Sequence, residues 1–222
     1  MEILVRAASL VIGYIFGLFQ TGYIIGKVKK VDIRQMGSGN AGTTNAMRTL
    51  GAKAGILTFI GDCAKTILAM VVCRLLVSCF YPDLLNVNVI KYTIGMYAGL
   101  GAVLGHNFPF YLKFKGGKGI AATSGFIIAF GVWPMIPIGL VIFFGIVLVT
   151  KYVSLGSICL MIGFFIQLII FGQLGEGYGV EGPLLMEIYI LGFLFMVLAI
   201  IRHRANIVRL MNGTENKFSI KK

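Results

Sequence analysis

The 222-residue sequence contains few charged residues and very few acidic ones. Charged residues make up 13% of the chain, whereas hydrophobic residues make up 58% and the mean hydropathy is +0.90. So apolar a composition excludes an ordinary soluble domain and predicts an integral membrane protein. The stretches between the apolar runs are too short for a separate soluble domain, so we expect a single transmembrane domain over residues 1–222.

Paired cysteines, and the short apolar region typical of a cleaved secretory signal, are two further patterns that the sequence does not show. Four cysteines lie within apolar runs: Cys63, Cys73, Cys79 and Cys159. They form no CxxC pair and no cluster with histidine, so they predict neither a disulfide framework nor a metal site. The apolar stretch between Arg6 and Lys27 is too long for the hydrophobic region of a secretory signal, so we expect the first helix to be retained.

Long apolar runs predict an all-α protein with seven transmembrane helices, because about 20 apolar residues cross the hydrocarbon core. The predicted spans cover residues 3–26, 54–80, 88–105, 120–133, 134–150, 154–172 and 184–201. Residues 120–150 could form one helix, but it would be about 46 Å long against a core of about 30 Å. We therefore expect an interruption at Trp133-Pro134.

The basic residues support the odd number of spans and set their orientation. With seven spans, sixteen of the 20 Lys and Arg residues share one face: Lys27, Lys29, Lys30, Arg34, Arg48, Lys53, Lys113, Lys115, Lys118, Lys151, Arg202, Arg204, Arg209, Lys217, Lys221 and Lys222. Only Arg6 and Lys91 lie on the opposite face, and an excess of Lys and Arg marks the cytoplasmic side. We therefore predict an outside N-terminus and a cytoplasmic C-terminus, and we attribute the formal charge of +12 mainly to topology rather than to nucleic-acid binding.

The predicted cytoplasmic face carries four polar segments, at residues 35–48, 105–125, 151–157 and 202–217. In the second segment, Gly116, Gly117 and Gly119 surround Lys118 directly before a predicted helix. Backbone N–H groups and the helix N-terminus could hold an anion there. The spacing is not that of a Walker A loop, and a flexible glycine linker is the alternative interpretation.

The first polar segment is also rich in glycine and carries hydroxyl and amide side chains. Its candidate contacts to a substrate are Gly37, Ser38, Gly39, Asn40 and Asn45. Arg48 follows closely and could bind a phosphate through two N–H groups. A solvated turn is the alternative, but together the two glycine-rich segments predict a site for two anionic groups or one large one.

Histidines and one charged pair complete the set of candidates. His106 and His203 lie at cytoplasmic ends of predicted spans, where each could be a general base or an interfacial hydrogen-bonding residue. Asp62 and Lys65 lie three residues apart within the second predicted span. Ionisable residues are costly inside a bilayer, so we expect an inward-facing pair that acts either as an interhelical brace or within the site.

Four ordered motifs resemble the signature segments of the PlsY-type acyl phosphate:glycerol-3-phosphate acyltransferases of bacterial membranes. The motifs are GSGNAGTTN, GHNFPFYLKFKGGKGIAATSG, KYVSLGS and HRANIVRLMNGTENK, and with the Asp-x-x-Lys of the second span they cover nearly the whole chain. Small departures occur at Thr43, Thr66 and Lys151, where alanine, glycine and arginine are usual in the family. They leave the reaction class unchanged.

The resemblance implies an enzyme of the bacterial inner membrane whose active site faces the cytoplasm. It would transfer a fatty acyl group from acyl phosphate to the primary hydroxyl of glycerol-3-phosphate, giving lysophosphatidic acid and phosphate for phospholipid biosynthesis, without a cofactor. It also implies a soluble enzyme that produces the acyl phosphate. A transporter for an organic phosphate and a non-catalytic scaffold for anionic lipid are the competing classes.

The same resemblance assigns roles to the candidate residues. We expect the acyl phosphate to be held by Ser38, Arg48, Lys118 and the glycines of 116–119, and glycerol-3-phosphate to contact Lys118, Ser154 or Ser157, His203 and Asn206. The proton of the attacking hydroxyl could go to His106, to His203 or to a phosphate oxygen of a substrate. We favour the phosphate, because neither histidine has a nearby carboxylate in the sequence to orient it.

Overall fold

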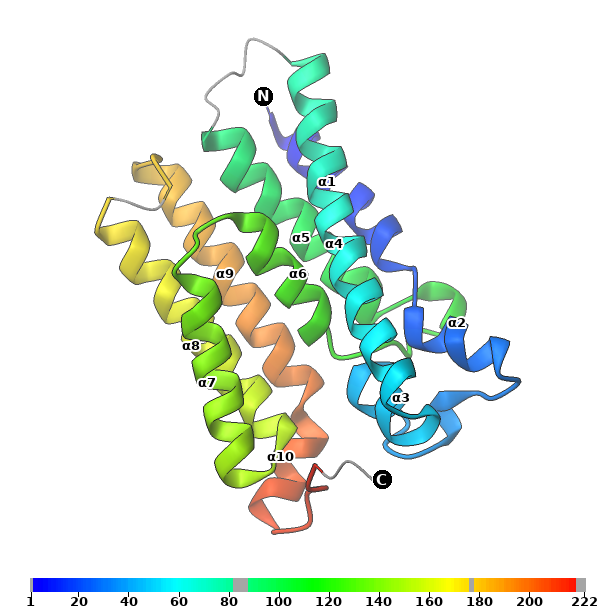
Figure 1. The fold of residues 1–222 in the computed structure, drawn as a ribbon. Helices are drawn as coiled ribbons and strands as arrows, with labels where there is room; N and C mark the ends of the chain where they lie inside the picture. The colour runs from blue at the N-terminus through cyan, green and yellow to red at the C-terminus, as the bar shows by residue number, and fades with distance from the viewer. Residues whose placement is uncertain (1, 82–87, 176–177, 219–222) are drawn as a thin grey trace. The chain divides into compact units, whose positions relative to one another are not determined.

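The computed structural model describes residues 2–81, 88–175 and 178–218, and in these ranges it contains helices but no strands (Figure 1). The elements are α1 (Glu2–Gly17), α2 (Thr21–Val28), η1 (Ile33–Gln35), α3 (Thr43–Leu50), α4 (Ala52–Phe80), the π-helix η3 (Val89–Ile94), α5 (Gly95–Asn107), η4 (Phe110–Leu112), α6 (Ile120–Phe130), α7 (Met135–Thr150), α8 (Val153–Gln173), α9 (Gly182–Arg202) and α10 (Arg204–Met211). They form two compact units, which we describe separately: unit 1 comprises the described residues up to Phe130, and unit 2 those from Gly131 onward.

Each of the seven predicted spans coincides with helical structure, so the all-α prediction is confirmed. Within the described ranges, four helices are long and apolar enough to cross a membrane: Ile3–Val28 (α1 and α2 together), α4, α8 and α9. The shorter apolar helices α6 and α7 are separated where we expected, because α6 ends at Phe130 and α7 begins at Met135. Seven crossings, the orientation and the single domain stay predictions, and Lys221 and Lys222 lie outside the described residues.

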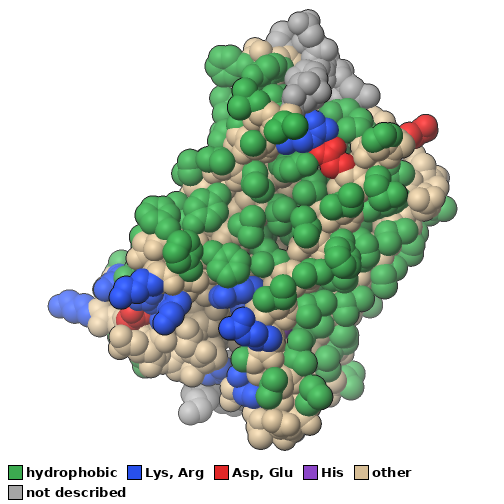
Figure 2. Space-filling view, turned by 180° about the vertical axis from the view of Figure 1, so that it is seen from behind, with side chains coloured by type: hydrophobic (Ala, Val, Ile, Leu, Met, Phe, Trp, Pro, Cys, Tyr) green, Lys and Arg blue, Asp and Glu red, His purple; other side chains and the backbone are tan. Residues whose placement is uncertain are grey.

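Large apolar side chains remain exposed along the helices. Val149 on α7 is 84% exposed and Leu75 on α4 is 60% exposed. Figure 2 shows hydrophobic side chains over most of the visible surface. A surface of this kind is unfavourable in water but suits the hydrocarbon core of a bilayer.

Glycines allow α1 and α5 of unit 1 to pack at close range. They are Gly13 and Gly17 on α1 and Gly101 and Gly105 on α5, spaced four residues apart on each helix. A Cβ atom at any of these positions would overlap a backbone carbonyl of the opposite helix. Such small-residue faces are typical of helix packing in membranes.

The first predicted span is not one continuous helix, because the chain breaks between α1 and α2 at residues 18–20. In an unbroken helix the carbonyl of Gly17 would accept from the N–H of Thr21. Instead the carbonyls of Gly17 and Phe19 accept from the Lys65 Nζ of α4, at 3.3 and 2.7 Å. The break therefore places two backbone acceptors beside a buried ammonium.

Two short helices formed where the sequence predicted none: α3 begins in the first polar segment, and α10 lies inside the last one. Glycines with left-handed backbone conformations follow both of them, Gly51 with φ +92° directly after α3 and Gly213 with φ +68° two residues after α10. Glycine at such a position is a common helix stop.

Candidate active site

Asn45, on the first turn of α3, organises the first glycine-rich segment of unit 1. Its Nδ2 donates to the carbonyls of Ile33, Met36 and Asn40 at 2.8, 3.1 and 2.9 Å. Its Oδ1 accepts from the N–H of Ser38 at 2.8 Å. The buried amide of Asn45 is thus used to shape the loop, whereas the sequence suggested that it contacts a substrate.

Ser38 lies exposed at the tip of this loop, between two glycines. Gly37 and Gly39 have φ of +59° and +70°, in the left-handed region that favours glycine. A Cβ atom at Gly37 would also overlap Asn45 Oδ1. The glycines therefore serve the turn itself, and Ser38 is exposed between them, as a substrate contact requires.

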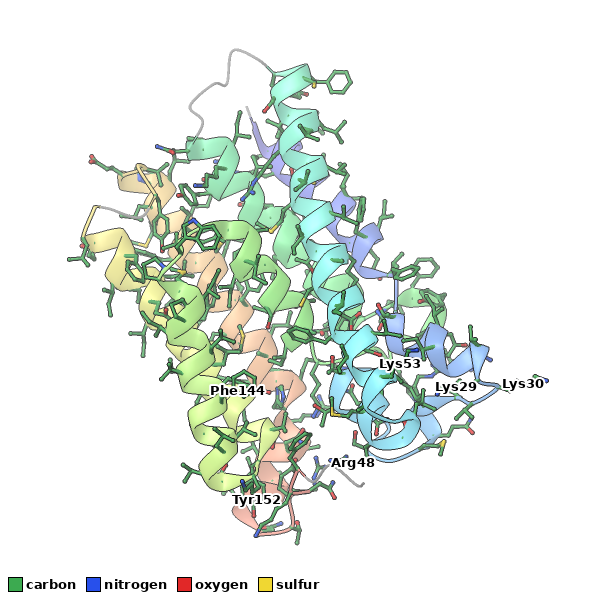
Figure 3. All side chains as sticks on the ribbon, in the orientation of Figure 1. Lys29, Lys30, Arg48, Lys53, Phe144 and Tyr152 are labelled. Atoms are coloured by element: carbon green, nitrogen blue, oxygen red, sulfur yellow. The ribbon has the colours of Figure 1, made fainter. Side chains whose placement is uncertain are left out.

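Arg48 extends from α3 at an end of unit 1 where several lysines gather. Figure 3 shows Arg48 at the same end as Lys29, Lys30 and Lys53. All four side chains are exposed, and Lys29 Nζ donates to the carbonyl of Leu50 at 3.3 Å. This concentration of positive charge attracts anions, and a direct contact of Arg48 with phosphate stays a prediction.

The second glycine-rich segment folds back onto the end of α5. Gly116 N–H donates to the carbonyl of Asn107 at 3.2 Å, and Gly117 N–H donates to the carbonyl of His106 at 3.0 Å. Both N–H groups are therefore paired within the protein. A contact of Gly116 or Gly117 with a substrate phosphate stays a prediction, and it would need these two hydrogen bonds to be shared or broken.

Lys118 and Gly119 lie at the N-terminus of α6, as the sequence predicted. Gly119 has φ +84°, and its carbonyl accepts from Thr123 N–H at 2.7 Å to begin the helix. Lys118 is half-buried directly before it. A lysine beside a helix N-terminus adds a full charge to the partial charge of the helix, a combination that suits an anion.

A buried ion pair in α4 connects three helical segments of unit 1. Lys65 Nζ lies 2.9 Å from Asp62 Oδ1 and 2.8 Å from His106 Nδ1 of α5. Thr21 Oγ1 of α2 donates to Asp62 Oδ1 at 3.2 Å. Gln20 Nε2, in the break before α2, donates to the carbonyl of His106 at 3.0 Å. These contacts favour the interhelical brace over direct participation of the pair in the reaction.

Lys65 also assigns the proton of His106. An ammonium group can only donate, so His106 Nδ1 accepts and the neutral ring carries its proton on Nε2. A general base needs a lone pair that can reach the substrate, but the lone pair of Nδ1 is already bonded to Lys65. The geometry therefore argues against the suggestion that His106 is the base.

Glu215, which the sequence analysis missed, lies at the centre of a polar cluster in unit 2. Its carboxylate accepts from Ser154 Oγ at 3.0 Å, Asn206 Nδ2 at 2.7 Å and Arg209 Nε at 2.7 Å. Burial by itself raises the pKa of Glu215, but these hydrogen bonds favour the charged form and bring its pKa below the ordinary value. Two predicted substrate contacts, Ser154 and Asn206, thus hold a carboxylate of the chain itself.

The remaining site candidates of unit 2 bond to nearby backbone. His203, buried at the end of α9, donates from Nδ1 to the carbonyl of Ala199 at 2.8 Å, so the neutral ring keeps its lone pair on Nε2. Ser157 Oγ donates to the carbonyl of Val153 at 2.8 Å. Of the two histidines, His203 is thus the one whose assigned tautomer fits a base.

The cysteines and acidic residues form no metal centre in the part of the chain that the structure describes. Cys63 and Cys73 are buried, and none of the four cysteines forms a disulfide within the described residues. Across residues 2–81, 88–175 and 178–218, no group of three His, Cys, Asp or Glu side chains is arranged to hold a metal ion.

Comparisons with known proteins identify the chain's relatives. The family model described as glycerol-3-phosphate acyltransferase matches residues 7–213. The chain is 39% identical to the glycerol-3-phosphate acyltransferase of Macrococcus caseolyticus, over 97% of this chain and 98% of the relative. It is also 39% identical to that of Clostridioides difficile, over 100% of both chains.

Two crystal structures share the fold. The glycerol 3-phosphate form of PlsY (YgiH), described as an integral membrane glycerol 3-phosphate acyltransferase, matches with a TM-score of 0.79 and 33% identity over 96% of both chains. The lysophosphatidic acid form matches with a TM-score of 0.77 and 32% identity, over 97% of this chain and 96% of the other.

The apolar helices, the polar clusters and these matches define an integral membrane acyltransferase. The chain belongs to the glycerol-3-phosphate acyltransferase family, and it is of the PlsY type. The resemblance drawn from the four sequence motifs is thereby confirmed, and the competing transporter and scaffold classes are not supported.

Proposed function

We propose that the chain transfers a fatty acyl group from acyl phosphate directly to the primary hydroxyl of glycerol-3-phosphate, releasing lysophosphatidic acid and phosphate. The observation that supports direct transfer, without an acyl-enzyme intermediate on serine, is the hydrogen bonding of the Ser154 and Ser157 hydroxyls. Each donates its only proton elsewhere, to Glu215 and to the carbonyl of Val153. A serine nucleophile would instead be paired with a base that can take its proton. A backbone carbonyl cannot take it, and Glu215 is a weak base because its hydrogen bonds lower its pKa, so a donor that is already activated fits this chain best.

Positive charge near the glycine-rich segments supports phosphate as the activating group. Arg48 lies at the same end of unit 1 as three exposed lysines, and Lys118 lies beside the N-terminus of α6. We propose that these two side chains and Ser38 hold the acyl phosphate. Because acyl phosphate is a mixed anhydride with a good leaving group, orientation and charge stabilisation supply much of the rate.

We place the proton of the attacking hydroxyl on a phosphate oxygen of a substrate, with His203 as the alternative base. The tautomer of His203 permits that role, whereas His106 Nδ1 is bonded to Lys65. His203→Ala distinguishes the two routes. If substrate phosphate is the base, turnover at saturating substrate falls modestly and keeps its pH profile, whereas the loss of a protein base costs about 10²–10⁴-fold.

We further propose the setting of the reaction. The chain crosses the bacterial inner membrane seven times, with a cytoplasmic C-terminus, and each of the four polar segments faces the cytoplasm. A soluble enzyme would supply the acyl phosphate there. The strong asymmetry of Lys and Arg along the sequence supports this orientation.

A donor assay on the purified protein in detergent tests the reaction. Palmitoyl phosphate plus glycerol-3-phosphate should yield lysophosphatidic acid and inorganic phosphate in equal amounts, measured by mass spectrometry and a phosphate assay. The palmitoyl thioesters of coenzyme A and of acyl carrier protein should yield none. Formation of lysophosphatidic acid from a thioester alone would contradict the proposed donor.

Arg48→Ala and Lys118→Ala test the phosphate contacts. Each should lower kcat/KM by about 10²–10³-fold, the usual effect of removing one group that stabilises charge in the transition state. Lys53→Ala is the matched control, because Lys53 is exposed at the same end of unit 1 as Arg48 and has no proposed role. Unchanged kinetics in Arg48→Ala or Lys118→Ala would remove that residue from the site.

A further inference from the structure

The imidazole of His106 occupies the space that a side chain at Gly117 would need. An ideal Cβ atom on Gly117 would lie 2.6 Å from His106 Cε1 and 2.8 Å from Cδ2, and it would overlap Nε2. Distances under 3.0 Å essentially never occur for real Cβ atoms. Gly117 lacks the positive φ of Gly119, so its backbone conformation is open to other residues. The three atoms nearest to its Cβ position all belong to the His106 ring, which is therefore the main obstacle.

The ring cannot move away cheaply, because a buried ion pair holds its other side. His106 Nδ1 accepts from Lys65 Nζ at 2.8 Å, and that ammonium is fixed by Asp62 at 2.9 Å and by the carbonyls of Gly17 and Phe19. The side chains of Asp62, Lys65 and His106 are 1–4% exposed. A swing of the ring would leave a buried donor without its partner, which is costly.

From these contacts we infer that His106 is a positioning residue for the glycine-rich loop, and that position 117 is glycine to admit the His106 ring. In this arrangement Asp62 and Lys65 fix the His106 ring. The ring packs against Gly117, and the carbonyl of His106 accepts from the Gly117 N–H. The position of Gly117 in turn determines that of Lys118, the next residue. This role differs from phosphate binding by the glycine, whose N–H group donates to the carbonyl of His106. The kinetic part of the inference rests on the proposed function, and the steric part does not.

A double-mutant cycle tests the steric part. Gly117→Ala should strongly lower the Tm and the activity in the wild-type background, because the new methyl group meets the ring. In the His106→Ala background the ring is gone, so the same change should cost little, and the activity lost on adding Gly117→Ala should be about tenfold smaller. Measurements are thermal unfolding in detergent and kcat/KM with both phosphate substrates.

Gly116 provides the matched control. A Cβ atom there would overlap the backbone carbonyl of His106, which His106→Ala does not remove. Gly116→Ala should therefore be equally harmful in both backgrounds. If Gly117→Ala is also equally harmful in both backgrounds, the glycine serves something other than the ring and the inference is wrong.

A second comparison separates positioning from general stability. His106→Asn keeps an acceptor near the place of Nδ1 for Lys65, whereas His106→Leu removes it. We expect His106→Asn to retain activity. His106→Leu should remain folded and monodisperse but should raise the apparent KM of one substrate, the same substrate whose KM rises in Lys118→Ala. Equal effects of Asn and Leu, or a change confined to the other substrate, would overturn the positioning role.

Failure of the inference can be told from failure of the proposed function. If the wild-type protein makes no lysophosphatidic acid from acyl phosphate, the proposed function fails. The Tm coupling between His106 and Gly117 is measured without any substrate, so it reports on the steric relation in either case.

Discussion

Glu215 shows how one acidic residue can order a basic segment. Its carboxylate joins Ser154 at the start of α8 with Asn206 and Arg209 on α10. Each contact is a hydrogen bond to a charged group, which contributes about 1.5–3 kcal/mol. The tail and two helices of unit 2 are thereby fixed by a single side chain.

Glu215→Gln should destabilise unit 2 in a pH-dependent manner. The amide can still accept from Ser154 and Asn206, but its NH₂ group faces the Nε–H of Arg209, so we expect a loss of about 1–3 kcal/mol at neutral pH. The pKa of Glu215 is lowered in the folded state from an ordinary value of 4.5. Its contribution is therefore complete above pH 4.5 and is lost as the pH falls through the folded pKa.

Thermal unfolding of the wild type and of Glu215→Gln across pH 3.5–8 measures this effect, because the range spans the ordinary glutamate pKa of 4.5. The gap between wild type and Glu215→Gln should be constant near neutrality and close towards the acid end. Glu181→Gln is the control, since Glu181 is exposed before α9. A gap that persists unchanged at the lowest pH would contradict the role of the carboxylate charge.

At the residue scale, the sequence singled out polar side chains and loops but not the groups to which they are hydrogen-bonded. Ser154 and Asn206 do meet, but on Glu215, and Gly116 and Gly117 do approach a polar group, but it is the end of α5. The same donors can satisfy a phosphate or an internal acceptor, and residue type alone does not distinguish these. A lone glutamate in an otherwise basic tail was the available signal for Glu215.

At the scale of elements, apolar runs predicted every long helix because each is longer than the hydrocarbon core requires. They could not predict the break between α1 and α2, because the only strongly polar residue in it, Gln20, is too little to interrupt an apolar run. The donor that satisfies the broken helix, Lys65, lies more than forty residues away in the sequence. The short helices α3 and α10 were missed because polar segments carry no membrane signal, although Gly51 and Gly213 beyond them were visible stops.

The close packing of α1 against α5 predicts a large effect of one methyl group. A Cβ atom at Gly101 would overlap the carbonyl of Leu10, so Gly101→Ala should lower stability by about 1–3 kcal/mol, as overpacked cores do. Gly145→Ala on α7 is the control, since nothing lies within 4 Å of its Cβ position. Equal Tm values for the two variants in detergent would show that α1 and α5 are not in close contact.

At the scale of the whole molecule, the distribution of charge predicts the side of the membrane on which each segment lies. Lys53 and Glu181 serve as markers of opposite sides of the membrane. Five predicted spans separate them along the chain, and an odd number of crossings places them on opposite sides. With the native cysteines replaced, Lys53→Cys should react with a membrane-impermeant maleimide only in inside-out vesicles. Glu181→Cys should react only in right-side-out vesicles, and labelling of both from the same side would contradict seven spans.

The break between α1 and α2 makes the shape of the N-terminal segment depend on a side chain from elsewhere in the chain. Residues 3–28 are apolar enough to form one straight rod, yet the carbonyls of Gly17 and Phe19 are drawn away from the helix by Lys65. Within a membrane, unpaired carbonyls must find a donor or return to the helix. Lys65 supplies a donor to both carbonyls and Gln20 a second one to Gly17, so the interruption leaves neither acceptor unsatisfied within the apolar segment.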